Sequence, residues 1–313
     1  MTTQDMFGQG AEGEPATPGS YGEAPAGHRL PEATHLGPVR LQTADLARSI
    51  AYYERVLGLR VVRREAGRAA LGPHGEERVL VELHERRGAR PGGIGPRLGL
   101  YHFAILLPER AALGRFVNHL ERIGARAGAA DHLVSEALYL HDPDGLGIEV
   151  YADRPRDTWR RVGRELMIAT DPLNFADLSR AAQGAQWTGM PAGTVIGHVH
   201  LHVGSLEEAS RFFSHALGFD RMTWRYPGAL FLGAGGYHHH LGTNTWAGPS
   251  ATPPAADDAR LLEWTIELPD AASADGAAAS LGANGYPVER AAGGDVITRD
   301  PWGTQVRLLV AGA

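Results

Sequence analysis

A pattern of one strand, one helix and further strands occurs four times in this 313-residue chain, and this internal repeat limits the possible folds more than any other feature. Two copies align without a gap, GPVRLQTADLARSIAYYERVLGL (37–59) and GHVHLHVGSLEEASRFFSHALGF (197–219). Each has an alternating strand, a helix N-cap at Asp45 or Ser205, an amphipathic helix with two adjacent aromatic residues, and a Leu-Gly stop. The repeat predicts modules of the order βαβββ.

The other two copies are recognised by how they open and close. They open with YHFAILLPER (101–110) and EWTIELPDAA (263–272), and they close with DPDGLGIEVY (142–151) and DPWGTQVRLL (300–309). Asp-Pro-x-Gly is a tight turn that leads into a final strand. The four modules therefore run over about residues 36–90, 98–155, 195–247 and 260–312.

Composition adds a tail and a connector to these modules. Residues 1–34 are rich in Gly, Pro, Ala and Glu, and we expect them to form a disordered tail. A polar, partly helical connector at 156–194 separates two pairs of modules, so that in sequence order a first domain covers 35–155 and a second covers 195–313.

Charge and residue usage exclude several classes of partner and site. With 30 basic and 36 acidic residues the net charge is −6, and the chain has no long basic block, so nucleic acid is not an expected partner. No stretch approaches the ~18 apolar residues of a membrane span or resembles a signal-peptide core, and we expect a cytoplasmic protein for which a homodimer remains open. The chain has no cysteine, so any metal must be held by His and carboxylate side chains.

One strand carries an unusual number of imidazoles. Alternation along residues 198–203 puts His198, His200 and His202 on one face and three aliphatic residues on the other. The aliphatic face must pack against a helix, which leaves the histidines lining a hollow. A polar cleft with hydrogen-bonded histidines is the alternative to a metal site.

Two segments connect this pattern to a known family. GGYHHHLGTNTW (235–246) and HLVSEALYLHDPDGLGIEVYADRP (132–155) resemble the catechol 2,3-dioxygenase-like subgroup of the vicinal-oxygen-chelate (glyoxalase, bleomycin-resistance and extradiol-dioxygenase) superfamily. The resemblance covers nearly everything after residue 35. It implies an α+β fold in which two βαβββ modules curl into an open barrel with a metal on its concave face, and hence two glyoxalase-like open β-barrels for this chain.

The resemblance also implies which positions hold the metal. Extradiol enzymes take a His from the first strand of one module, and a His from the first strand and a Glu from the last strand of its partner. The corresponding positions here are Pro38, His102, His198 and Glu263 on the first strands, with Glu149 and Arg307 on the last strands of the second and fourth modules.

We predict the pairing of the modules from which pairs would give one barrel the full set of two His ligands and one Glu ligand. Pairing them in sequence order leaves both barrels incomplete. Pairing the second module with the third brings together His102, Glu149 and His198, a triad that suits Fe(II) and leaves positions for a diol and O2. We therefore predict crossed pairing of modules 2+3 and 1+4, in which a companion barrel with Pro38, Glu263 and Arg307 does not bind iron in this way.

Two further residues resemble the acid–base groups of extradiol enzymes. Tyr139 precedes Glu149 by ten residues, as the active-site tyrosine of the family does, although a tyrosine packed in the core would fit the same strand. His132 opens a segment that resembles a substrate-contacting loop, but the run from it to Tyr139 is two residues shorter than in the family. We expect both residues to be catalytic.

A third acid–base candidate lies in a run of histidines. By its position 42 residues after His198, His240 resembles the acid–base histidine of the subgroup. His238 or His239 takes its place if the strand register shifts, and an exposed histidine run without a catalytic role is the other interpretation.

Together these residues predict an Fe(II)-dependent extradiol dioxygenase that cleaves a catechol- or hydroquinone-type aromatic ring with O2. A glyoxalase-type isomerase or lyase using Mn(II), Zn(II) or Ni(II) is one alternative, because the superfamily shares a scaffold and not a reaction. A metal-free protein that binds an aromatic ligand or drug is another. The sequence does not identify the substrate.

Overall fold

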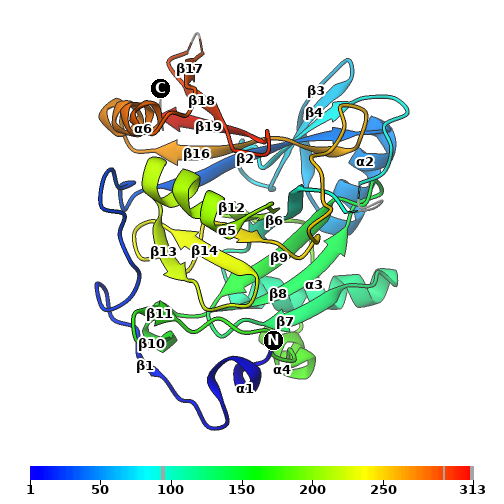
Figure 1. Cartoon of the computed structure of the whole chain (residues 1–313). Helices are drawn as coiled ribbons and strands as arrows, with labels where there is room; N and C mark the ends of the chain where they lie inside the picture. The colour runs from blue at the N-terminus through cyan, green and yellow to red at the C-terminus, as the bar shows by residue number, and fades with distance from the viewer. Residues whose placement is uncertain (93–95, 292, 311–313) are drawn as a thin grey trace.

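The chain folds into four βαβββ units in the computed structural model, which describes residues 1–92, 96–291 and 293–310 (Figure 1). The first unit consists of β2 (His35–Thr43), α2 (Leu46–Tyr52) with a π-helical turn (Tyr53–Leu57), β3 (Arg60–Glu65), β4 (Arg68–Gly72) and β5 (Val81–Glu85). The second consists of β6 (Gly99–Leu106), α3 (Arg110–Ile123), β7 (Gly128–Asp131), β8 (Ser135–His141) and β9 (Gly147–Asp153).

The third and fourth units repeat this order. The third consists of β12 (Val195–His202), α5 (Leu206–Ala209) with a π-helical turn (Ser210–Ala216), β13 (Asp220–Thr223), β14 (Ala229–Gly233) and β15 (Leu241–Asn244). The fourth consists of β16 (Arg260–Leu268), α6 (Ala271–Ala283), β17 (Glu289–Arg290), β18 (Val296–Arg299) and β19 (Gln305–Val310). The side chains of Asp45, Ser205 and Asp270 cap the helices that follow them, as such residues do at an N-cap.

Two eight-stranded sheets form the body of the molecule. The inner-module sheet, from modules two and three, has the order β13-β14-β15-β12-β6-β9-β8-β7. The outer-module sheet, from modules one and four, has the order β17-β18-β19-β16-β2-β5-β4-β3. The two modules of each sheet are joined by an antiparallel pair of first strands, β12 with β6 and β16 with β2. The predicted α+β class is confirmed.

The two sheets lie as stacked layers (Figure 1), and aliphatic side chains of both sheets belong to one buried core. Val199 and Leu201 of β12 are fully buried in one continuous core that also contains Trp264 and Ile266 of β16. Alternation along β12 therefore turns the histidine face of the strand away from the outer-module sheet.

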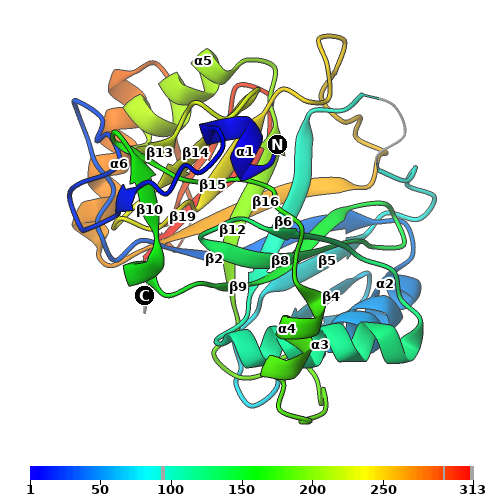
Figure 2. The same cartoon turned by 90° about the horizontal axis from the view of Figure 1, so that it is seen from below.

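The connector that lies outside the modules packs against both the main core and a second apolar cluster. The connector contains β10 (Arg160–Val162), β11 (Glu165–Leu166) and α4 (Phe175–Ala181), and α4 lies beside α3 (Figure 2). Its side chains Trp159, Leu166 and Ile168 form a second apolar cluster with residues of the third module. The connector therefore covers part of the third module.

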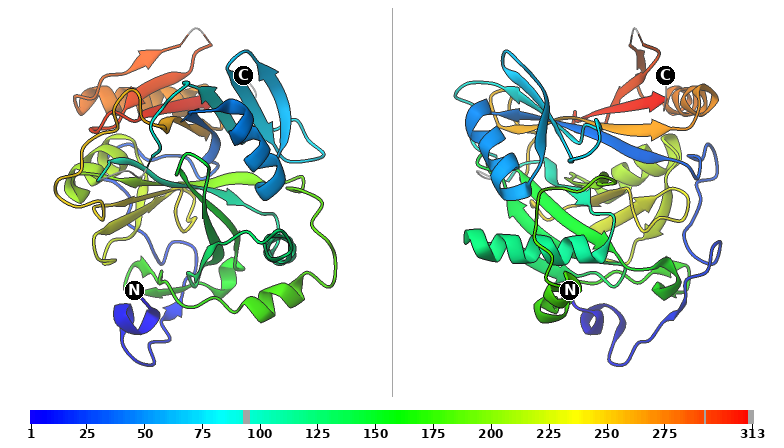
Figure 3. Two further views of the ribbon diagram at one scale, coloured as in Figure 1. Left: turned by 90° about the vertical axis from the view of Figure 1, so that its right-hand side faces the viewer. Right: turned by 180° about the vertical axis from the view of Figure 1, so that it is seen from behind.

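Residues 1–34, expected to be a disordered tail, follow a defined path along this side of the molecule (Figure 3). They include α1 (Thr3–Phe7) and β1 (Glu14–Pro15), which pairs with β10. Leu30 is buried, and Arg29 makes a two-pronged ion pair with Asp220 on β13. Composition does not reveal this path, because it depends on partners far away in the sequence. No helix in the described residues is long and apolar enough to cross a membrane.

Candidate metal centre

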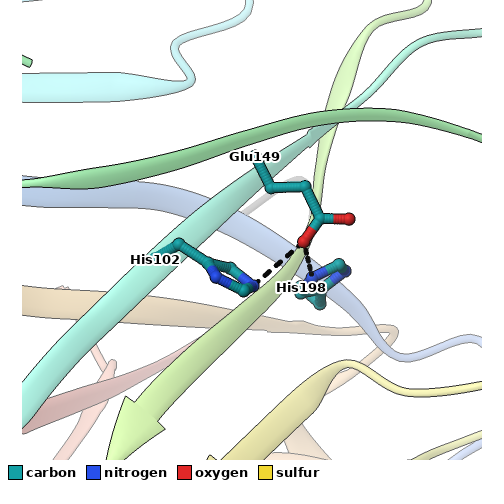
Figure 4. Close-up of side chains that lie close together, drawn as sticks. All are labelled: His102, Glu149 and His198. Atoms are coloured by element: carbon teal, nitrogen blue, oxygen red, sulfur yellow. Dashed lines mark hydrogen bonds and ion pairs between the residues drawn. The ribbon is translucent and has the colours of Figure 1, made fainter. Parts of the chain in front are cut away.

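His102 on β6, Glu149 on β9 and His198 on β12 meet at the centre of the inner-module sheet (Figure 4). Nε2 of His102 lies 3.0 Å from Oε2 of Glu149, and Nε2 of His198 lies 3.1 Å from the same oxygen. The side chains converge because β6 is flanked by β9 on one side and β12 on the other. Their residues are only 5, 2 and 2% exposed, respectively.

This arrangement fits a metal ion. Ligand atoms that each lie about 2.1 Å from one ion, on adjacent octahedral positions, are about 3.0 Å apart, which matches the two distances measured here. Nε2 of His102 is buried and makes no acceptable hydrogen bond, a condition that costs roughly 1–3 kcal/mol unless a ligand satisfies the atom. Across the described residues, this is the group of His, Asp and Glu side chains whose ligand atoms converge, all within 4.8 Å of one another.

The electrostatics favour the protonation states that bind metal. Burial raises the pKa of Glu149, but His198 and His102 beside it outweigh burial and hold the pKa well below its usual range. Burial lowers the pKa of His198 to about 4. A carboxylate beside a neutral imidazole is the form in which these side chains coordinate a cation.

Tyr139 and His132 form a hydrogen-bonded pair next to the triad. Tyr139 on β8 lies directly across from Glu149 on β9, and its ring centroid is 5.5 Å from that of His102. Nδ1 of His132 donates to the carbonyl oxygen of Ala169 at 2.6 Å, so in the neutral ring Nε2 accepts the hydrogen bond from the Tyr139 hydroxyl. Burial raises the pKa of Tyr139 well above its ordinary value and keeps this hydroxyl protonated.

The structure does not bring His240 to the triad. Residues 238–240 lie in the irregular segment before β15, so strand alternation does not apply to them. The ring of His240 packs on Tyr237, and its Nδ1 accepts from the backbone N–H of Ala234 at 3.2 Å. His239 is the member of the run nearest the triad, with its ring centroid 4.2 Å from that of His198.

The remaining histidines of β12 are held by Asn244 of β15. Nδ2 of Asn244 donates to Nε2 of His200 at 3.0 Å, while Oδ1 of the same amide accepts from Nδ1 of His202 at 2.6 Å. The hydrogen-bonded cleft that we considered as an alternative therefore describes His200 and His202. Beside them lies a cavity of about 570 Å³, whose wall includes Tyr101 and Trp246.

The equivalent position in the outer-module sheet is occupied by ion pairs. Arg307 holds Glu263 with two contacts, Nε to Oε1 at 2.9 Å and Nη2 to Oε2 at 3.0 Å. Nη1 of Arg40 lies 3.0 Å from Oε1 of Glu263 as well. Two guanidinium groups stand where a cation would have to bind, and Pro38 supplies no ligand, so the described residues of this sheet offer no comparable site.

Asp153 is a polar residue near the site that the motif analysis missed. Its Oδ1 lies 2.9 Å from Nε2 of His238. The residue is on β9 four positions after Glu149, and strand alternation places Glu149, Tyr151 and Asp153 on one face. Extending the alternation past the proposed metal ligand would have found it.

The fold and site can now be compared with known proteins. Residues 35–150 and 195–308 match the model of the Glyoxalase/Bleomycin resistance protein/Dioxygenase superfamily, and the chain belongs to this superfamily. It is 43% identical over 262 residues to the catechol-2,3-dioxygenase of Bacillus subtilis strain 168, an alignment that covers 82% of this chain and 91% of the relative.

Solved structures share the fold at low sequence identity. A Bacillus subtilis protein provisionally named a dioxygenase has a TM-score of 0.62 at 14% identity and covers 91% of this chain and 87% of its own. Glyoxalase I from Zea mays has a TM-score of 0.52 at 20% identity, with 89% and 92% covered. These two neighbours carry different names, so likeness of fold does not select a reaction.

Proposed function

We propose that this protein is an Fe(II)-dependent extradiol dioxygenase that cleaves a catechol- or hydroquinone-type aromatic ring with O2. The observation that carries the proposal is the convergence of two imidazoles and one carboxylate from β6, β12 and β9. The catechol-2,3-dioxygenase at 43% identity supports the reaction class. Fe(II) held by His102, Glu149 and His198 would supply a centre at which a diol and O2 exchange electrons.

The residues around the triad have the chemistry that such a substrate needs. Tyr139 keeps its proton, which it donates to His132, and its hydroxyl oxygen can accept a hydrogen bond from a hydroxyl of the substrate. His132 is its acceptor, and its ring is fixed by the carbonyl of Ala169. Tyr101 and Trp246 form an aromatic wall that can hold a flat ring in the cavity beside His202, and the ring of Tyr101 lies 4.9 Å from that of His102 between centroids.

A glyoxalase-type isomerase would need a fourth protein ligand. His200 is the nearest imidazole on the same strand face, but its Nε2 already accepts from Asn244. His240, the ligand that would have favoured an isomerase, packs away from the triad. Mn(II), Zn(II) or Ni(II) chemistry therefore receives less support from this site than oxygen chemistry does.

The test starts from protein purified without oxygen and loaded with Fe(II). Catechol and O2 are then added, while oxygen uptake and the yellow colour of the ring-cleavage product are recorded. We expect one O2 molecule to be consumed for each diol cleaved. We also expect loss of both bound iron and activity in His102→Ala, Glu149→Ala and His198→Ala. His215→Ala, which removes an exposed imidazole of the third module, is the control and should keep both. Full iron binding and turnover in all three ligand variants would refute the proposal.

A further inference from the structure

We propose that the cavity beside His202 is a binding site for an aromatic carboxylate, in which Arg260 recognises the carboxylate and the wall of Tyr101 and Trp246 holds the ring. The further conclusion, that the substrate is a dihydroxylated aromatic acid, rests on the proposed function. The binding site itself follows from the charges and the exposed rings of this cavity and can be tested separately.

The walls of the cavity come from both sheets. Leu100 and Tyr101 belong to β6 of the inner-module sheet, whereas Arg260 and Leu261 belong to β16 of the outer-module sheet. The volume of about 570 Å³ lies within the range of about 300–1,000 Å³ that is usual for pockets that bind small molecules. The outer-module sheet therefore contributes residues to a cavity beside His202, although it offers no metal site of its own.

The charges of the cavity do not cancel. Its described lining contains three arginines, Arg90, Arg97 and Arg260, and a single carboxylate, Asp258. Oδ1 of Asp258 lies 2.8 Å from Nη2 of Arg90, and Oδ2 of Asp258 lies 3.3 Å from Nε of Arg97. Asp257, which is not part of the lining, lies 3.0 Å from Nη2 of Arg90 as well. Carboxylates therefore balance Arg90 and Arg97, and the excess positive charge belongs to Arg260.

Arg260 has donors that the chain does not use. Its Nε is buried and has no hydrogen-bond partner among the residues that the structure describes. A buried N–H group without an acceptor destabilises the protein until a ligand or water satisfies it. A guanidinium is planar and binds a carboxylate through two parallel hydrogen bonds, so a carboxylate on a ligand would satisfy both the charge and the donors.

Two exposed aromatic rings stand in the same cavity. Tyr101 is 39% and Trp246 is 45% exposed, and they are two of the four large apolar side chains that are exposed in the described chain. Nε1 of Trp246 donates to the carbonyl oxygen of Pro227 at 3.0 Å, and its backbone N–H donates to Oδ1 of Asn244 at 3.0 Å. The indole is thus held in place while its face stays uncovered. Such rings favour a flat aromatic ligand.

Tyr101 connects this cavity to the metal centre. Its ring centroid lies 4.8 Å from that of His202 in the cavity and 4.9 Å from that of the metal-ligand candidate His102. A ring that packs against Tyr101 is therefore close to the triad. A diol on that ring is the group offered to the metal, and a carboxylate is the group offered to Arg260. Catechol itself lacks the group that Arg260 recognises.

Binding is measured by calorimetry without oxygen, with iron-loaded protein and with benzoate and benzyl alcohol as probes. Both probes have the same ring, but only benzoate is charged. We expect benzoate to bind at least tenfold more tightly than benzyl alcohol, Arg260→Gln to abolish this difference, and Arg260→Lys to restore part of it. Arg64→Gln removes an exposed arginine of β3 outside the cavity and is the control, with the difference kept.

A carboxylate could also bind the iron, and a metal-ligand variant separates the two sources of affinity. We expect the affinity for benzoate to change less than threefold in His102→Ala. An affinity that is lost in His102→Ala and kept in Arg260→Gln would place the carboxylate on the metal and overturn the proposal. Equal binding of the two probes by the unaltered protein would overturn it as well.

Kinetics test the substrate class. The ratio of kcat/KM for a dihydroxybenzoate to kcat/KM for catechol is measured with the 2,3- and 3,4-isomers, and the better isomer is compared between variants. We expect Arg260→Gln to lower this ratio at least tenfold, mainly through a higher KM for the acid. An unchanged ratio, or cleavage of catechol and of neither acid by the unaltered protein, would refute the acid as substrate.

The two experiments distinguish failure of this site from failure of the proposed function. A protein that cleaves catechol, but binds benzoate equally well with and without Arg260, would refute the site and leave the dioxygenase assignment intact. Binding of benzoate that depends on Arg260, in a protein that cleaves no diol, would uphold the site and refute the reaction.

Discussion

The place of some side chains at the candidate site could be predicted from the sequence, and that of others could not. His102, Glu149 and His198 were predictable because each lies inside a regular strand, where alternation and the family motif locate a side chain on the concave face. His240 was predicted from its position 42 residues after His198, with His238 or His239 as the alternatives, and residues 238–240 lie in the irregular segment before β15. Their orientation is set by tertiary contacts, such as the stacking of His240 on Tyr237, which no local pattern encodes.

The Tyr139 hydroxyl should matter for turnover and not for metal binding. Tyr139→Phe removes the donor to His132 and keeps all three triad side chains. We expect kcat with catechol to fall on the order of 100-fold, as for loss of a general acid–base group, with iron content unchanged. Tyr286→Phe in the fourth module is the control for loss of a tyrosine hydroxyl. Wild-type turnover in Tyr139→Phe would remove this residue from the catalytic set.

Burial of a turn carboxylate should make stability depend on pH. Burial raises the pKa of Asp142 from its ordinary 3.8 to about 6, although its Oδ1 accepts from the backbone N–H groups of Asp144 and Leu146. The folded state therefore binds this proton more tightly than the unfolded state does. The bound proton contributes roughly 3 kcal/mol to the free energy of unfolding, and this contribution is full below about pH 4 and is lost as the pH rises to about 6.

Asp142→Asn keeps the acceptor oxygen and cannot ionise. The free energy of unfolding, measured by urea titration between pH 4 and 6.5, should therefore fall less with rising pH than in the unaltered protein. Asp300, the equivalent residue of the fourth module, also has its pKa raised by burial to about 6, and its Asn variant should behave in the same way. Identical pH slopes in all three proteins would contradict this account.

At the scale of elements, the repeat predicted the four βαβββ units, because periodicity and capping residues are local signals. The order of strands within a sheet is not a local signal. The motif alone lists ligands on β6, β9 and β12, and it is the adjacency of these strands that brings the side chains within reach. Arg307 opposite Glu263 likewise gave a chemical reason to expect no iron in the other sheet.

Close approach of β9 to β6 should depend on Gly147. A Cβ built at this position would lie 2.0 Å from the carbonyl oxygen of Tyr101, a contact that backbone atoms cannot tolerate. Gly147→Ala should shift the start of β9 and lower the affinity for iron at least tenfold, as measured by anaerobic titration. Gly282→Ala in α6 meets no atom within 4 Å and is the control, with affinity unchanged and helix stability raised by up to about 1 kcal/mol. If Gly147→Ala and the unaltered protein bound iron with equal affinity, Gly147 would not be needed to position Glu149.

At the scale of the whole molecule, the connector and the first 34 residues pack against the modules of the inner-module sheet. The composition of the first 34 residues suggested disorder, since composition counts residues and takes no account of the partners that they meet. The structure seats Leu30 in the main core and Ala16 in the second cluster, beside residues of the third module. Segments that belong to no module thus contribute to the packing around the site, as Ala169 of the connector does by accepting a hydrogen bond from His132.

Removal of residues 1–34 should lower stability and leave the metal centre in place. The truncation exposes the core beneath Leu30 and breaks the Arg29–Asp220 pair, a loss on the order of 3 kcal/mol, or several degrees in the melting temperature. Calorimetry measures the first effect and iron titration the second. A melting temperature equal to that of the full chain would show that the segment contributes nothing to the fold.

The central claim is that one metal ion binds between modules two and three. Crystals grown anaerobically with Fe(II) and measured at the iron absorption edge test it directly. The account predicts a single anomalous peak per chain, in contact with Nε2 of His102, Nε2 of His198 and a carboxylate oxygen of Glu149. A peak beside Glu263 in the outer-module sheet, or no peak at the triad under saturating iron, would contradict it.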